Sequence, residues 1–185
     1  MTNLQPTTID GAWLMTPTQF PSFGGSFMTV SPPPGLCPML GWFSAEQVSL
    51  STAVQGTIRG IHYTTNAQKK IVSCVRGAVW DVVVDLRLDS STFGQWFGAE
   101  LSEDNRIQMV IGAGLGHGYC VRSPHATLLY QLSRLYDPKA EREIDPLDFE
   151  LGTWWDGDPD RWAQKPFLSE RDRNAPPLSS LREVL

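Results

Sequence analysis

The residue types that could do acid–base chemistry gather in one short stretch, residues 56–70, which reads GTIRGIHYTTNAQKK. It places Arg59, His62 and Lys70 between two segments rich in valine and isoleucine. An imidazole can remove a proton beside a carbonyl group, and a nearby cation can hold the charge that then develops on the carbonyl oxygen. The stretch therefore indicates proton abstraction next to a carbonyl.

A metal site is the competing chemistry, and it is disfavoured. A cupin-type centre needs two histidines one residue apart and a carboxylate, but the chain contains only His62, His117 and His125, which are far apart. A three-histidine site is still arithmetically possible. His125 follows a proline in a polar stretch, which predicts a surface loop. The glycine-rich residues 112–118, GAGLGHG, precede no helical pattern, so they predict a turn between strands, with His117 beside it, rather than a phosphate loop. We expect no metal and no cofactor.

The elements that must position these residues are short strands. Sixteen glycines and fourteen prolines separate segments rich in valine, isoleucine and aromatic residues. The clearest hairpin turns at Gly77, where a positive φ is available. In its second arm Asp81, Val83 and Asp85 alternate with Val82, Val84 and Leu86. Further strands are predicted at 93–101, 107–111, 119–122 and 127–133, a loop at 31–38 and a short helix at 179–185. The pattern predicts an all-β sandwich or small barrel.

Length and charge limit the number of domains and the kinds of partner that the protein can have. The 185 residues favour a single domain, with a strand and loop region at 1–45 and a tail at 156–185 that wraps the surface. A net charge of −5 without a basic cluster argues against nucleic acid. The chain has no run of 18 apolar residues and no secretory pattern at its start, so we expect a cytoplasmic protein with no membrane partner. The odd number of cysteines, Cys37, Cys74 and Cys120, predicts free thiols.

Several motifs together carry a resemblance. The segments RGIHY, DVVVDLR, SSTFGQW, HGY, LLYQLSRLY and LSERDRNAP occur in this order. Over about residues 46–172 the chain resembles the dTDP-4-dehydrorhamnose 3,5-epimerase family, which includes 3-epimerases of antibiotic pathways. The resemblance implies a cupin-type jelly-roll with short peripheral helices, acting as a metal-independent homodimer to which residues 1–45 contribute. The implied substrate is a nucleotide-linked 4-keto-6-deoxyhexose, epimerised at C3, C5 or both.

The resemblance also implies roles for individual residues. His62 matches the base, Asp172 the carboxylate that orients it, Tyr130 the acid on the opposite face, and Lys70 the cation that stabilises the enolate. Without the resemblance, Tyr130 would be interpreted as a core tyrosine and Asp172 as a solvated charge. Inversion at carbon needs a base and an acid on opposite faces of the ring, and imidazole and phenol suit these tasks. Positions implied in binding substrate or nucleotide are Gln47, Ser49, Arg59, His117, Tyr136 and Glu141.

The chain departs from the family pattern where the nucleotide is held. Gly24 and Thr29 stand where an arginine and a glutamate are usual, Ser49 replaces an asparagine, and Lys69 replaces a glycine. Lys69 or Arg171 could substitute for the missing phosphate anchor. Two alternatives stay open: the same chemistry on a different, non-nucleotide ketone, and a non-catalytic sugar-binding module on the same fold.

Overall fold

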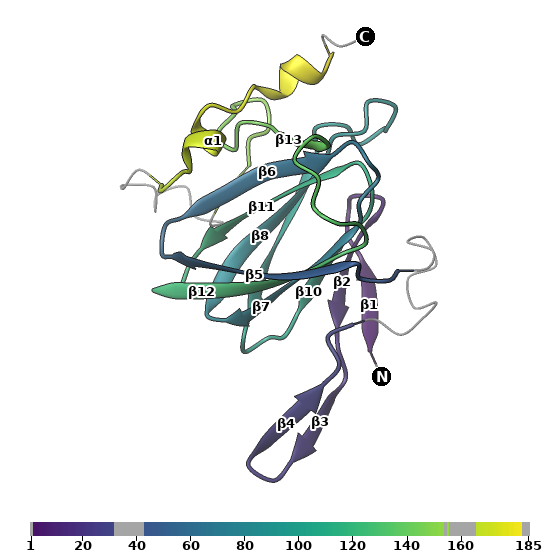
Figure 1. The fold of residues 1–185 in the computed structure, drawn as a ribbon, viewed down its shortest axis with the longest axis vertical. Helices are drawn as coiled ribbons and strands as arrows, with labels where there is room; N and C mark the ends of the chain where they lie inside the picture. Colours follow the sequence, from purple (N-terminus) through teal and green to yellow (C-terminus); the bar gives the residue numbers. More distant parts are fainter. Residues whose placement is uncertain (1, 32–42, 154, 156–165, 183–185) are drawn as a thin grey trace.

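The structure, a computed structural model, describes residues 2–31, 43–153, 155 and 166–182. Two antiparallel sheets face each other, and a separate hairpin projects from them (Figure 1). The first sheet has the order β1 (Asn3–Pro6), β2 (Ala12–Thr16), β10 (Gln108–Ile111), β7 (Lys70–Arg76), β12 (His125–Leu132) and β5 (Gln47–Val54). The second has the order β13 (Glu141–Glu143), β6 (Ile58–Thr64), β11 (Leu115–Val121), β8 (Ala78–Asp85) and β9 (Trp96–Ser102). The prediction of an all-β jelly-roll with short helices is confirmed.

The main core lies between the two sheets. It includes Val72 and Leu128 from the first sheet and Val83 and Leu101 from the second, all fully buried. The predicted hairpin is present as β7 and β8, and Gly77 in its turn has φ 75°. Alternation along β8 then sends Val83 into this core and its neighbours Val82 and Val84 to the other face of the sheet.

The outer face of the second sheet is buried as well. The later part of the chain covers it with Ile144, Leu151 and Trp155, which pack on Val82 and Ile61. Beyond these, the covering layer ends in a short helix, α1 (Glu170–Arg173), and a 3₁₀ helix, η3 (Leu178–Arg182). Because both faces of this sheet are largely covered, most residues of its central strands β8 and β11 are apolar or glycine.

Several predicted boundaries were wrong. Only residues 112–114 of the glycine-rich stretch lie outside strands, because β11 begins at Leu115 and carries His117 in its interior. The physical reason is close packing: a Cβ on Gly118 would lie 2.8 Å from Trp155 Cη2 in the covering layer. His125 is exposed as predicted, but it begins β12 instead of lying in a loop.

Other elements begin or end a few residues away from their predicted positions. The strand predicted at 93–101 is β9, which starts at Trp96 because residues 91–94 form a turn. The helix predicted at 179–185 is the 3₁₀ helix η3, while α1, only four residues long, has no detectable periodicity and was missed. The loop predicted at 31–38 lies outside the described residues apart from Ser31, and Cys37 lies outside them altogether. Cys74 and Cys120 are both buried, and Cys74 is a free thiol, as predicted.

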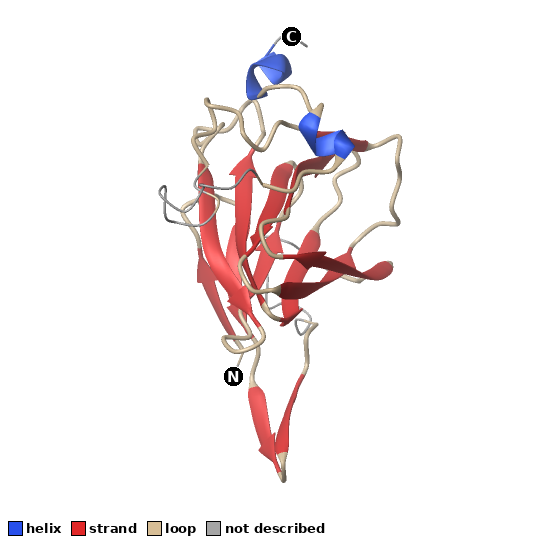
Figure 2. Ribbon diagram, turned by 90° about the vertical axis from the view of Figure 1, so that its left-hand side faces the viewer, coloured by secondary structure: helices blue, strands red, loops and turns tan. Residues whose placement is uncertain are grey.

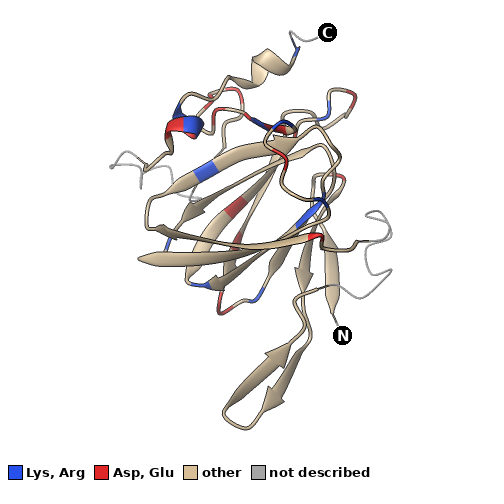
Figure 3. Cartoon of the chain, viewed as in Figure 1, with Lys and Arg blue, Asp and Glu red and all other residues tan. Residues whose placement is uncertain are grey.

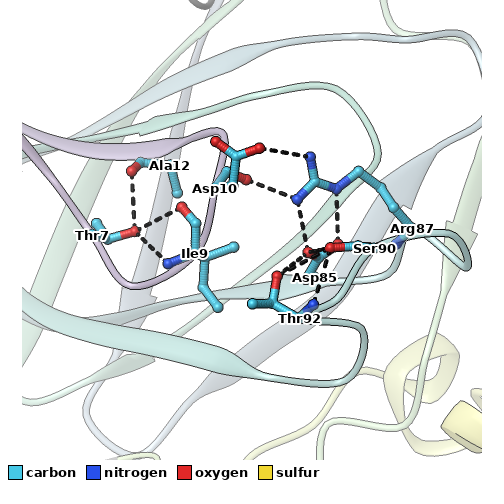
Figure 4. Close-up of polar contacts among 8 residues, drawn as sticks. All are labelled: Thr7, Ile9, Asp10, Ala12, Asp85, Arg87, Ser90 and Thr92. Carbon is cyan, nitrogen blue, oxygen red and sulfur yellow. Dashed lines mark hydrogen bonds and ion pairs between the residues drawn. The ribbon is translucent and has the colours of Figure 1, made fainter.

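A buried carboxylate joins the N-terminal loop to the end of β8 (Figure 4). Asp85 accepts hydrogen bonds from Arg87 Nε at 2.9 Å and from Ser90 and Thr92 hydroxyls at 2.6 Å each. Arg87 also donates to the backbone carbonyl of Asp10 at 2.9 Å. Burial opposes ionisation of Asp85, but the effect of these hydrogen bonds is larger and lowers its pKa to about 2. The ionised carboxylate therefore holds the loop that leads into β2.

The projecting hairpin consists of β3 (Gln19–Ser22) and β4 (Gly25–Met28) (Figure 2). Its residues carry no charge, as Figure 3 shows by colour, and Phe20 and Phe27 are more than half exposed. Gly24, which stands where an arginine was expected, lies at the tip with φ 77°. No helix in the described part of the chain is long and apolar enough to cross a membrane.

Candidate active site

A cavity of about 380 Å³ opens between the two sheets, a volume suited to a small-molecule ligand. Strands β5, β6, β7, β11 and β12 contribute its walls. Nine of the eleven residues predicted to act in catalysis or binding line it: Gln47, Ser49, Arg59, His62, Lys70, His117, Tyr130, Tyr136 and Glu141. The fold thus brings together residues that are far apart in the sequence, since Gln47 and Glu141 are separated by 94 positions.

A β-bulge places Arg59 and His62 on the same side of β6. Residues three apart on a regular strand point to opposite faces, but the pairing of β6 with β11 shifts by one residue between His117 and Tyr119. Gly60, which has φ 123°, makes the shift possible, since a Cβ there would lie 2.5 Å from the Cα of Gly118. Both side chains therefore reach the cavity.

Asp172 orients the His62 ring. His62 Nε2 and Asp172 Oδ1 are 2.6 Å apart, and the carboxylate is fully buried. Ser169, the N-cap of α1, donates its hydroxyl to the other carboxylate oxygen at 2.7 Å. Burial raises the pKa of Asp172, but the bonds from His62 and Ser169 outweigh it and hold the pKa below its usual value. An ionised Asp172 favours the tautomer with the proton on Nε2, which leaves Nδ1 free to accept a proton.

A second pair was not predicted. His117 lies directly opposite His62 across the β6–β11 pairing, and its Nε2 is 2.8 Å from the fully buried Asp81 Oδ2. Burial raises the pKa of Asp81, although His117 and Lys70 act against the rise. The alternating pattern of the sequence predicts only the strand face of Asp81 and no role for it. Its position in a strand otherwise rich in valine was the available signal, because a carboxylate facing a core needs a partner.

Lys70 supplies a buried positive charge. It begins β7 and is 9% exposed. Burial lowers the pKa of its ammonium group, while Glu141 and Asp81 partly counteract this effect. A cation with little water around it interacts strongly with a developing oxyanion.

Tyr130 lies across the cavity from β6, on β12 of the first sheet. Its ring contacts His117 edge to face, with ring centroids 6.1 Å apart. Burial raises the pKa of Tyr130 well above its usual value, so the phenol stays protonated. A second phenol, Tyr119, also lines the cavity and was not predicted; its hydroxyl is 3.3 Å from Ser51 Oγ.

Polar side chains form the rim of the cavity. Gln47 accepts a hydrogen bond from the backbone N–H of Tyr136 at 2.8 Å and donates to Ser49 Oγ at 3.0 Å. Arg171 does not line the cavity; it makes ion pairs with Glu141 at 3.5 Å and with Glu143. Among the described residues, no group of three His, Cys, Asp or Glu side chains is arranged to hold a metal ion.

Comparison with known proteins agrees with this geometry. The family model for dTDP-4-dehydrorhamnose 3,5-epimerase matches residues 6–180. A dTDP-4-dehydrorhamnose 3-epimerase from Streptomyces niveus is 39% identical over 184 residues, which are 98% of this chain and 86% of that protein.

Solved structures are similar over the same length. NovW, a 4-keto-6-deoxy sugar epimerase from the novobiocin gene cluster of Streptomyces spheroides, aligns with a TM-score of 0.91 at 38% identity, covering 100% of this chain and 91% of NovW. The epimerase RmlC from Legionella pneumophila, in complex with dTDP-4-keto-L-rhamnose, aligns with a TM-score of 0.88 at 33% identity, covering 97% and 94%. The chain belongs to the dTDP-4-dehydrorhamnose 3,5-epimerase family.

Proposed function

We propose that this isomerase inverts C3, C5 or both in a nucleotide-linked 4-keto-6-deoxyhexose, as a step of deoxysugar biosynthesis. The observation that carries the proposal is the cavity itself, which the Asp172-bound His62 shares with Tyr130. A base on one strand and an acid on another are what inversion of a carbon next to a ketone requires.

His62 removes the proton next to the C4 ketone, and the electron pair of the broken C–H bond forms the enolate. Lys70 and His117 stabilise the negative charge on the C4 oxygen. Tyr130 then donates its proton to the opposite face of the carbon, which restores the ketone with inverted configuration. Each general acid or base step of this kind contributes about 10²- to 10⁴-fold in rate.

The nucleotide part of the substrate is assigned to the rim. Gln47, Ser49, Tyr136 and Glu141 offer polar groups and an aromatic ring there, and Arg59 offers a cation. The dTDP-sugar bound to the Legionella enzyme supports a nucleotide-linked ligand. With Gly24 at the hairpin tip, Arg59 is the cavity-lining guanidinium available for phosphate, with Arg171 held nearby by Glu141.

The proposal includes a homodimer. The hairpin exposes Phe20 and Phe27, and the outward face of edge strand β5 exposes Val48, Leu50 and Val54. Exposed apolar side chains that lie together, as those of Phe20 and Phe27 do on the hairpin, mark association surfaces. Light scattering of the purified protein should give twice the mass of 20.6 kDa. We also infer a cytoplasmic location, with which the buried free thiol Cys74 agrees.

Deuterium incorporation tests the reaction. With dTDP-4-keto-6-deoxyglucose in deuterated water, the protein should introduce deuterium at C3, at C5 or at both, and His62→Ala should abolish it. His125→Ala is the matched control, since His125 is exposed and absent from the cavity wall. No incorporation and no binding of dTDP by the folded protein would refute the nucleotide substrate and favour another ketone. Ligand binding without any exchange would favour a sugar-binding module.

A further inference from the structure

The short helix that carries the carboxylate partner of the base depends on contacts with the rest of the protein. α1 has only four residues, and a helix much shorter than about 12 residues is not stable by itself in water. Before α1, Phe167 donates a backbone hydrogen bond to Gly56 at 2.9 Å and accepts one from Ile58 at 3.0 Å. After it, the carbonyl of Pro176 accepts from the backbone N–H of Asp145 at 2.8 Å. Between these two points, the position of α1 depends on its side chains.

Two adjacent side chains of α1 contact two residues that are neighbours in the sheet. Asp172 Oδ1 is 2.6 Å from Nε2 of His62 on β6. Arg171 donates from Nε to Oε2 of Glu143 on β13 at 3.0 Å, and from Nη2 to the same oxygen. Glu143 and His62 lie directly opposite each other in the pairing of β13 with β6, so their side chains leave the same face of the sheet. The Arg171–Glu143 ion pair therefore lies beside the His62–Asp172 pair.

Arg171 lies between two carboxylates of β13. Besides its two bonds to Glu143, its Nη1 is 3.5 Å from Oε2 of Glu141. The side chains of Arg171 and Glu143 are 39% and 27% exposed, so water weakens their attraction. Two charge-assisted hydrogen bonds from one guanidinium, within a network of three charges, nevertheless fix its geometry better than an isolated surface pair does. Glu143 thus holds Arg171, and Arg171 holds α1 on the sheet.

The position of α1 matters because Asp172 orients the His62 ring only at hydrogen-bond distance. The carboxylate of Asp172 is fully buried, and a buried charge that loses its partner is strongly destabilised. A displacement of about 1 Å in a catalytic arrangement can cost about 10²-fold in rate. A contact that limits the movement of α1 therefore preserves the orientation of the imidazole.

We propose that Glu143 is a positioning residue of the epimerisation: through Arg171 it holds α1 on the sheet and thereby keeps Asp172 against His62. The proposal rests on the function proposed above, in which His62 is the base. It gives Arg171 a different task from that of a phosphate anchor, since its guanidinium is bound by carboxylates and lies outside the lining of the cavity.

The variant Glu143→Gln tests this assignment through kcat and KM, measured separately with dTDP-4-keto-6-deoxyglucose in deuterated water. The amide keeps the size of the side chain and removes its charge. We expect kcat to fall about 3- to 10-fold, less than for a buried charged hydrogen bond because the pair is partly exposed. KM and the affinity for dTDP, measured by calorimetry, should change less than about twofold. An Arg171 that served as the phosphate anchor would give the opposite result, with a changed KM and an unchanged kcat.

Proton NMR provides a readout that does not depend on turnover. The proton in the short hydrogen bond between His62 and Asp172 should resonate downfield of ordinary imidazole N–H protons. Its signal is identified by its loss in His62→Ala, because His117 beside Asp81 should give a second one. In Glu143→Gln the His62 signal should move upfield as the bond to Asp172 lengthens.

A matched control and an exchange of charges separate positioning from general stability. Glu150→Gln is the control, because Glu150 pairs with Arg182 of η3 at 3.7 Å and should leave kcat, KM and the NMR signal unchanged. Glu143→Arg and Arg171→Glu should each lower kcat by about 10-fold or more, because each places like charges together. The double variant should recover kcat to within about threefold of the wild type, since it rebuilds the ion pair with opposite polarity.

The proposal is overturned if Glu143→Gln leaves kcat and the NMR signal unchanged, if it changes KM instead of kcat, or if the exchange of charges recovers nothing. An equal effect of Glu150→Gln would also overturn it. A wild-type protein that introduces no deuterium refutes the proposed function instead, and the NMR signal then still shows whether Glu143 positions the His62–Asp172 pair.

Discussion

Replacing Asp172 by asparagine should leave a folded protein whose base no longer works. Asp172 is fully buried, and its two oxygens have different partners, His62 Nε2 at 2.6 Å and Ser169 Oγ at 2.7 Å. In Asp172→Asn the amide oxygen can still accept from Ser169, which directs the NH₂ group toward His62. The imidazole must then accept with Nε2, so its proton moves to Nδ1 and the lone pair that takes the substrate proton is lost.

The expected size of the effect follows from this change of tautomer. An asparagine in place of the orienting aspartate of a catalytic histidine costs up to about 10⁴-fold in kcat in serine proteases, where the geometry is similar. The loss of one charge-assisted hydrogen bond alone costs about 1.5–3 kcal/mol, or roughly 10- to 100-fold. We therefore expect kcat for epimerisation to fall between about 10²- and 10⁴-fold, with little change in KM.

The assay is the appearance of deuterium at C3 or C5 under saturating substrate, with thermal unfolding measured in parallel. Ser169→Ala serves as the control, because it removes the second bond to Asp172 and leaves the carboxylate against His62. A folded Asp172→Asn variant with turnover within threefold of the wild type would refute the claim that this carboxylate sets the tautomer of His62.

Four further predictions concern the enolate cation, the stability of the fold at two positions and its assembly. Lys70→Met keeps the length of the side chain but removes the buried charge near Asp81, so kcat should fall about 10²-fold or more while dTDP binding, measured by calorimetry, persists. The pKa of Asp85 is 3.8 in the unfolded chain and about 2 in the folded protein, so its ionisation contributes about 2 kcal/mol to the unfolding free energy. This contribution is fully present above pH 3.8 and is lost as the pH falls toward 2. The unfolding free energies of Asp85→Asn and the wild type, measured with urea, should therefore become equal near pH 2. A Cβ on Gly118 would lie 2.8 Å from both Arg59 O and Trp155 Cη2, so Gly118→Ala should lower the unfolding free energy by about 1–3 kcal/mol, whereas Gly25→Ala, with no atom within 4 Å of the new Cβ, should not. Phe27→Asp in the exposed hairpin should shift the sedimentation of the proposed dimer toward the monomer without loss of secondary structure by circular dichroism.

Local patterns in the sequence were sufficient for the central hairpin and for the all-β class. The alternation along β8 and the positive φ at Gly77 depend on near neighbours in the chain, so they can be recognised without the fold. The stretch at residues 56–70 indicated His62 by its neighbours Arg59 and Lys70. The resemblance to a family supplied Tyr130 and Asp172, whose types alone would have been assigned to the core and to the surface.

The tertiary structure decided how those candidates meet. Gly118 permits β11 to pack against Trp155 in the covering layer, and the bulge at Gly60 turns Arg59 and His62 to one side of β6. Both features depend on residues far away in the sequence, so a local sequence pattern cannot predict them. The partner Asp81 was missed for the same reason, because its role depends on the contact with His117. A strand pattern specifies which face a side chain takes, but the register between strands distant in sequence determines which side chain it touches, and that register follows from the packing of the whole domain.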